Sequence, residues 1–119
     1  MPDKLILVAD DELEICRVLG EYLNELGYSV LLAENGEQAV ELADEHEPDL
    51  VFLDIKMPRT TGLEALGRIR ERHPRMKVIM ITGVDDKMLA REALLLGASD
   101  FIPKPFSFSY MKRVLDSLV

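Results

Sequence analysis

The segment that decides the fold is Asp49–Pro58, DLVFLDIKMP, in which the apolar run Leu50–Leu53 is followed directly by the carboxylate of Asp54. A short apolar run that contains Val and Phe predicts a strand buried on both faces, because an amphipathic strand would alternate and a helix would be longer. Asp54 then stands at the carboxyl end of a central strand, where open parallel sheets bind their ligands. An alternative role for Asp54 is to cap the following turn, a common use of aspartate.

Outward from this segment, apolar strand patterns alternate with amphipathic helix patterns along the chain. Four further strands are predicted, at residues 5–9, 28–33, 78–81 and 100–102. Five helices are predicted from their 3.6-residue periodicity and end signals, at residues 15–26, 37–45, 63–73, 85–96 and 107–118. The short connections indicate parallel strands with right-handed crossovers, so we expect helices on both faces of one sheet.

The predicted fold class is therefore α/β, with a single doubly wound, five-stranded parallel sheet of the flavodoxin-like order 2-1-3-4-5 in one domain over residues 1–119. Ser107 is expected to cap the last helix. Cys16 is expected to lie off the apolar face of the first helix as a partly buried spectator. That apolar face is expected to comprise Ile15, Val18, Leu19, Tyr22, Leu23 and Leu26.

The composition excludes several classes of protein. The 119 residues, 48% hydrophobic and 30% charged, are typical of a globular domain, and the net charge of -8 argues against a nucleic-acid surface, which needs clustered Lys and Arg. A single cysteine excludes an internal disulfide or a cysteine metal cluster and fits a reducing cytoplasm. No apolar run approaches the roughly 18 to 20 residues of a membrane span, and we expect a soluble cytoplasmic protein without a signal peptide.

Polar residues follow four of the five predicted strands. Asp10 and Asp11 follow the first strand, and Asp54, Thr82 and Lys104 end the third, fourth and fifth. The strand order puts the two leading aspartates beside Asp54 at the switch point of the sheet. Three carboxylates in one crevice repel one another unless a cation joins them, and Mg2+ with oxygen ligands suits such a site. With a lysine and a hydroxyl added, these residues predict a phosphoryl-binding site.

With these residues in place, the chain resembles the receiver domain of a bacterial two-component response regulator of the chemotaxis-regulator type. The resemblance covers the chain from Lys4 to its end. It rests on four motifs in order: Asp10–Asp11, residues 54–58 with Gly62, Thr82–Gly83 and residues 101–106. Two positions depart from the family pattern. Thr61 stands where Asp or Asn is usual, and Gly83 stands where Ala is commoner.

The resemblance implies a phosphorylation-controlled signalling switch. Asp54 would accept a phosphoryl group from a sensor histidine kinase or phosphotransfer protein, and water would later hydrolyse it. Asp10, Asp11 and Asp54 would bind Mg2+, with the backbone carbonyl of Lys56 as a further ligand. The chain would thus catalyse its own phosphorylation and dephosphorylation without acting as an enzyme on a free substrate.

The resemblance also implies how the signal leaves the site. Thr82 and Lys104 would hold phosphoryl oxygens, and Phe101 would act with Thr82 as the switch that alters the fourth helix, fifth strand and fifth helix. That surface is expected to bind an output domain beyond residue 119, a separate target or a second copy of the chain. Ile15 and Pro105–Phe106 are expected to rim the pocket where the kinase docks.

Three other functions compete with this interpretation. A haloacid-dehalogenase-type phosphatase would need a second aspartate two residues after Asp54, where this chain has Lys56. A nucleotide or flavin module would place glycines and hydroxyls after the first strand, whereas Asp10–Asp11–Glu12 would repel a phosphate. The remaining alternative is an interaction module of the same fold that is never phosphorylated.

Overall fold

The computed structural model describes residues 4–57, 60–83, 87–104 and 107–118. Its strands are β1 (Leu5–Ala9), β2 (Ser29–Ala33), β3 (Leu50–Asp54), β4 (Lys77–Thr82) and β5 (Asp100–Pro103). Its helices are α1 (Leu13–Glu25), α2 (Gly36–His46), α3 (Gly62–Arg72), α4 (Lys87–Leu95) and α5 (Phe108–Leu118). Within these residues, no helix has both the length and the apolar character that a membrane crossing requires.

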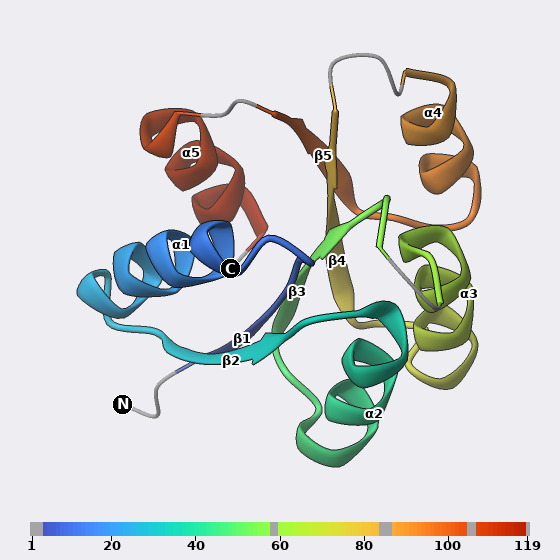
Figure 1. Ribbon diagram of the computed structural model, residues 1–119, viewed down its shortest axis with the longest axis horizontal. Coiled ribbons are helices and arrows are strands. Elements are labelled where there is room, and N and C mark those ends of the chain that lie inside the picture. Colours follow the sequence, from blue (N-terminus) through green and yellow to red (C-terminus); the bar gives the residue numbers. More distant parts are fainter. Residues whose placement is uncertain (1–3, 58–59, 84–86, 105–106, 119) are drawn as a thin grey trace.

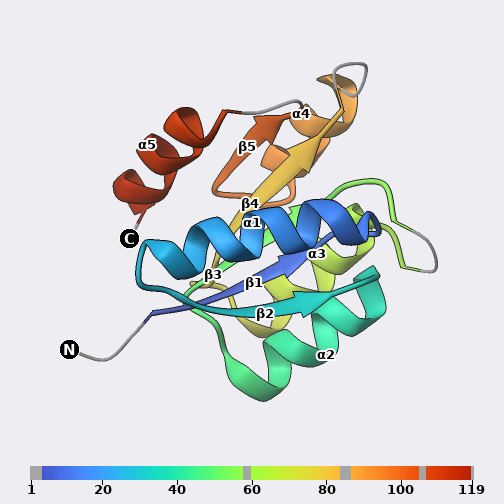
Figure 2. The same ribbon diagram turned by 60° about the vertical axis from the view of Figure 1, so that its left-hand side comes forward.

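The strands form one parallel sheet in the order β2-β1-β3-β4-β5, which confirms the predicted fold class. Helices α1 and α5 cover one face of the sheet, and α2, α3 and α4 cover the other (Figures 1 and 2). β3 lies at the centre, and all five of its residues are buried. A strand covered on both faces has no polar side to present, which is why residues 50–53 form an unbroken apolar run.

Successive residues of each strand feed two separate cores. Leu7 and Val51 point into the core shared with α2, α3 and α4. Ile6 and Phe52, one residue away in each strand, point into the core shared with α1 and α5. This alternation follows from the two-residue period of a strand, and it commits almost every side chain of the central strands to packing. The polar chemistry is therefore confined to the strand ends.

The apolar face of α1 differs from the predicted one. Cys16 is only 2% exposed and packs in the core with Leu19 and Leu23, whereas Val18 and Leu26 are exposed. The prediction for Cys16 was wrong because the apolar residues of α1 cover a wide arc, and only contact with the sheet selects the buried part of it. The Cys16 thiol donates to the carbonyl of Asp10 at 3.3 Å, and burial raises its pKa to about 11, so it remains a thiol.

Side-chain caps define the starts of three helices. Asn35, Thr61 and Ser107 each accept a hydrogen bond from the backbone N–H three residues further on, at 2.8, 3.3 and 3.1 Å. The Ser107 cap confirms the prediction for α5. Thr61, at the position where the family that the chain resembles usually has Asp or Asn, supplies a capping oxygen to α3, so this departure from the pattern preserves the local structure.

Arg70 joins two turns at the end of the molecule opposite the carboxyl ends of the strands. Its guanidinium donates to the carbonyls of His73, Pro74 and Met76 after α3, and to the carbonyl of Gly97 after α4. Burial lowers the pKa of Arg70 below its ordinary value. Gly97 has a positive φ of 105°, which a glycine adopts without strain, and this brings its carbonyl within reach of the guanidinium.

Arg70→Met should lower the free energy of unfolding by about 2 kcal/mol, because two partly buried and two exposed carbonyls lose their donor while the apolar stem is kept. Urea unfolding measures the change. Arg68→Met, an exposed arginine on the same helix, is the matched control and should change stability by less than about 0.5 kcal/mol. Equal unfolding midpoints for the two variants would show that Arg70 contributes nothing through these bonds.

Candidate functional site

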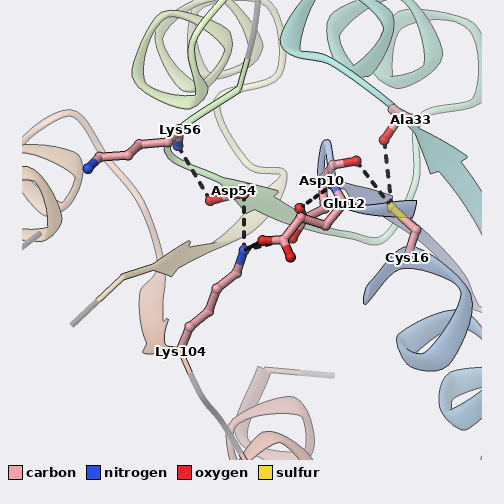
Figure 3. A network of polar contacts seen from close by, with 7 residues as sticks. All are labelled: Asp10, Glu12, Cys16, Ala33, Asp54, Lys56 and Lys104. Carbon is pink, nitrogen blue, oxygen red and sulfur yellow. Dashed lines mark hydrogen bonds and ion pairs between the residues drawn. The ribbon is translucent and has the colours of Figure 1, made fainter. Parts of the chain in front are cut away.

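The predicted site residues meet at the carboxyl ends of the strands. Asp10 follows β1, Asp54 ends β3, Thr82 ends β4 and Lys104 follows β5. The two aspartates and the threonine are at most 5% exposed. Figure 3 shows the side chain of Lys104, which follows the end of β5, reaching to Asp54 and Asp10. The structure thus brings together side chains that lie far apart in the sequence.

Backbone hydrogen bonds beyond the regular ladder hold the strand tips in register. The N–H of Ile55 donates to the Ile81 carbonyl at 3.1 Å, and the N–H of Lys104 donates to the Thr82 carbonyl at 2.6 Å. The N–H of Asp10 donates to the carbonyl of Ala33 in the same way, at 3.1 Å. The functional side chains therefore start from fixed backbone positions.

Gly62 allows the segment after Asp54 to fold back on the strand tip. Its N–H donates to the Ile55 carbonyl at 2.8 Å, and a Cβ at this position would lie 2.0 Å from the Asp54 carbonyl oxygen. Gly36 lies equally close to the backbone of Thr60, with a Cβ placed 2.0 Å from its carbonyl oxygen. Any side chain at either glycine would push the loop away, so these close approaches require glycine.

One ammonium group is shared by three carboxylates. Lys104 Nζ lies 3.2 Å from Asp54 Oδ2, 3.2 Å from Asp10 Oδ2 and 3.3 Å from Glu12 Oε1 (Figure 3). Its hydrogen bonds go to Asp54 and Glu12, while its contact with Asp10 is an ion pair without hydrogen-bond geometry. Asp10 Oδ1 accepts from the N–H of Glu12 at 2.9 Å, and Asp54 Oδ1 accepts weakly from the N–H of Lys56 at 3.4 Å.

Burial and charge shift the pKa values at this centre in opposite directions. Burial, followed by the negative charge of Asp10, raises the pKa of Asp54 to about 7, and Lys104 offsets only part of this shift. Burial alone would favour the neutral amine of Lys104, but the charges of Asp54 and Asp10 outweigh it and raise its pKa above the ordinary value. The lysine is therefore positively charged, but its single charge does not balance the two buried carboxylates.

The acidic residues fit a hard divalent cation. Carboxylate oxygens of Asp10, Asp11 and Glu12 lie within 4.8 Å of one another. In the described part of the chain, the buried Asp10 Oδ2 accepts no hydrogen bond, so it has an unused lone pair beside this group. Oxygen ligands of this kind suit Mg2+. The side chain of Lys56 extends away from Asp54 in Figure 3, and the ligand predicted from this residue is its carbonyl rather than its amine.

Thr82 and Phe101 line one apolar hollow between α4 and the ends of β4 and β5. The hollow has a volume of about 490 Å³. It is lined by Thr82, Gly83, Ala90, Arg91, Leu94, Phe101 and Pro103. Phe101 is half-buried there and packs against the core on the α4 side of the sheet. The two residues predicted to act together therefore line the same hollow.

Two further outcomes concern the predicted docking rim and a partner of Lys104. Ile15 is half-buried on the first turns of α1, and Pro105–Phe106 lies outside the described residues, so the predicted kinase-docking rim stays a prediction. Glu12 was not predicted as a partner of Lys104. A signal for it existed, because Glu12 stands just before a helix where Ser, Thr, Asp or Asn is the preferred cap.

The raised pKa of Asp54 predicts that metal-free protein loses stability as pH rises. The folded chain holds the proton of the Asp54 carboxyl more tightly than the unfolded chain does. The stability that this proton contributes is therefore fully present below pH 3.8 and is lost as the pH rises to about 7. The Asp54→Asn variant has no charge at this position at any pH. Its free energy of unfolding should exceed that of wild type by about 2 kcal/mol near pH 8 and by much less near pH 4. Urea unfolding in EDTA measures both values, with the exposed Glu41→Gln as control. A pH-independent difference would contradict the shift.

Comparison with known proteins gives one family over nearly the whole chain. The family model described as response regulator receiver domain matches residues 6–116. The chain is 37% identical over 105 residues to the alkaline phosphatase synthesis transcriptional regulatory protein PhoP of Bacillus subtilis, covering 88% of this chain and 44% of that protein. It is 40% identical over 102 residues to the transcriptional regulatory protein CpxR of Klebsiella pneumoniae, covering 86% and 43%. The chain therefore spans less than half the length of these relatives.

Solved structures share the fold. The receiver domain of NtrX from Brucella abortus superposes with a TM-score of 0.91 at 35% identity, covering 95% of this chain and 96% of that one. The chemotaxis protein CheY4 of Vibrio cholerae superposes with a TM-score of 0.92 at 24% identity, covering 99% and 100%, and this match concerns the fold alone.

Proposed function

The chain belongs to the response regulator receiver domain family of two-component systems, and we propose that Asp54 is the residue through which it accepts a phosphoryl group. The observation that carries this proposal is the buried Asp54 carboxylate at the tip of the central strand, 3.2 Å from the Lys104 ammonium. We propose that the receiver unit extends over residues 1–119, that its phosphodonor is a sensor histidine kinase or phosphotransfer protein, and that it acts in the cytoplasm.

The proposed reaction is a displacement at phosphorus. A carboxylate oxygen of Asp54 forms the new P–O bond, the P–N bond of the donor phosphohistidine breaks, and the imidazole leaves with the electron pair. Water later attacks the acyl phosphate and releases inorganic phosphate and the free carboxylate. Phosphoryl transfer needs mainly positioning and charge neutralisation, and Lys104 supplies one positive charge next to the nucleophile.

Mg2+ is the proposed cofactor, held by Asp10, Asp11, Asp54 and the carbonyl of Lys56. When bound, it would neutralise charge on the transferring phosphoryl oxygens. The excess negative charge at the strand tips and the unused lone pair of Asp10 support this choice of a hard cation. Thr82, at the tip of the strand next to Asp54, would donate its hydroxyl to a phosphoryl oxygen.

Asp54→Asn should abolish labelling by acetyl phosphate, because the amide cannot act as the attacking carboxylate. Intact-protein mass spectrometry with Mg2+ present measures the added phosphoryl group, and omission of Mg2+ should strongly reduce it. Asp49→Asn is the matched control, because Asp49 immediately precedes the other end of β3 and should leave labelling unchanged. Full labelling of the Asp54 variant would refute the assignment and favour an interaction module that is never phosphorylated.

We propose that the signal leaves through the hollow beside α4. A phosphoryl group on Asp54 would draw the Thr82 hydroxyl toward it through a charge-assisted hydrogen bond. Phe101, which faces the same hollow, would then turn into the vacated space. Phe101 has no hydroxyl to hold its outward position, so the two states should differ little in free energy. A differential affinity of about 5.5 kcal/mol would convert nearly the whole population.

The surface of α4, β5 and α5 is the proposed output surface. Met88 and Leu95 of α4 are 86% and 82% exposed, which supports an apolar contact with another protein. The proposed partners are an output domain, a separate target protein or a second copy of the chain. No nucleic-acid contact by this chain is proposed, since its net charge is -8.

Beryllofluoride, a phosphoryl mimic, should shift amide signals across α4, β5 and α5 in the wild-type protein, because Thr82 and Phe101 move together. Heteronuclear NMR measures the shifts, and light scattering measures oligomer size. Thr82→Ala should bind the mimic but lose the distant shifts. Thr60→Ala, a buried threonine outside the hollow, should keep them. Shifts confined to the Asp54 loop in wild type, or distant shifts in Thr82→Ala, would contradict this route.

A further inference from the structure

We propose that Glu12 is a positioning residue that shares the Lys104 ammonium with Asp54 and helps it move from the nucleophilic oxygen to the oxygens of the incoming phosphoryl group. This inference rests on the proposed function, because it concerns how Asp54 becomes able to attack phosphorus. It assigns a role to a residue that neither the predicted acceptor site nor the predicted metal site includes. The evidence is the contact between Glu12 Oε1 and Lys104 Nζ at 3.3 Å.

Lys104 obstructs the oxygen that it neutralises. Its ammonium donates a hydrogen bond to Asp54 Oδ2 at 3.2 Å, and only 20% of the Lys104 side chain is exposed. A lone pair engaged by an ammonium is a weaker nucleophile, and a phosphorus atom bonding to Oδ2 would need the space where Nζ now lies. Lys104 must therefore move off Oδ2, toward the oxygens of the incoming phosphoryl group, before the P–O bond forms there.

The neighbouring carboxylates indicate the direction in which the Lys104 ammonium can move. Asp10 is fully buried, and its Oδ2 is the oxygen that a divalent cation would claim. Glu12 is 61% exposed and lies toward the rim of the site, so it can follow the ammonium outward. Figure 3 shows the ammonium between Asp54 on one side and Asp10 and Glu12 on the other. Glu12 is thus the carboxylate that can stay in contact with Lys104 while the ammonium turns to the phosphoryl oxygens.

The side chain of Glu12 has no competing duty in its own helix. Glu12 is the N-cap of α1, with φ -89° and ψ 103°, yet its carboxylate makes no capping hydrogen bond. Its backbone is fixed by the N–H donated to Asp10 Oδ1 and by the carbonyl that accepts from the Cys16 N–H at 3.1 Å. Asp, Asn or Ser would cap the helix better. The contact with Lys104 explains why a longer acidic side chain stands here.

The Glu12→Asp variant distinguishes an effect of side-chain length from an effect of charge. Aspartate keeps the negative charge but is one methylene shorter, and it is a better N-cap, so the variant should be at least as stable as wild type. With saturating Mg2+ and acetyl phosphate, its maximal labelling rate should fall about 3- to 10-fold. The half-saturating donor concentration should change less than about 2-fold. The maximal labelling rate of Glu12→Gln should fall by a similar factor, because a neutral amide holds an ammonium weakly.

Glu14→Gln is the matched control. Glu14 is exposed on the same turn of α1 and faces Arg17 at 3.9 Å, so its substitution removes the same charge close to the site without touching Lys104. It should label at the wild-type rate. A wild-type rate in Glu12→Asp would overturn the proposal: if Glu12→Gln is slow, only charge acts at this position, and if it is not, the side chain has no role in labelling.

A second measurement does not depend on phosphorylation. In unphosphorylated protein with Mg2+ alone, the Cε–Hε NMR signals of Lys104 should move in Glu12→Asp and stay in place in Glu14→Gln. If wild type is never labelled but the Lys104 signals respond in this way, the proposed function fails while the contact stands. Lys104 signals that match wild type in Glu12→Asp would overturn the positioning role itself.

Discussion

The ammonium of Lys104 between the buried carboxylates of Asp54 and Asp10 is the interaction on which the rest of the site depends. Two carboxylates in a water-poor crevice cannot both be charged without a nearby cation. The lysine supplies part of the positive charge, and the raised pKa of Asp54 shows that it does not supply all of it. The fold thus maintains a local deficit of positive charge, which a divalent cation is suited to meet and which makes the site responsive to a change of charge.

This deficit is held in place by a rigid frame. The strand tips are tied by backbone hydrogen bonds, and Gly62 lets the following loop press directly on the backbone of Asp54. One strand away, the hollow that Thr82 and Phe101 share leaves space for side chains to rearrange. A charge centre beside an apolar hollow fits the proposed switch, in which a local change in charge would act on packing at the edge of the site.

Much of the fold and site could be predicted because the signals are local. The four-residue apolar run Leu50–Leu53 in β3, flanked by Asp49 and Asp54, indicates a strand buried on both faces. Strand ends of a parallel sheet meet at one edge, so Asp10, Asp54 and Lys104 could be placed together. Cys16 could not be placed correctly, because the apolar arc of α1 is wider than the face that the sheet covers, and helical periodicity alone does not say which part is buried.

The amino-acid sequence by itself determined the alternation of elements and the residue types at the strand tips, since these depend on periodicity and on short-range backbone preferences. Only the tertiary structure decided which carboxylates share the Lys104 ammonium and that Glu12 is one of them. It also decided that the guanidinium of Arg70 would bind carbonyls in two separate turns. Such partners are chosen by distances of a few ångströms between segments remote in the chain, and those distances exist only after the sheet and helices have packed.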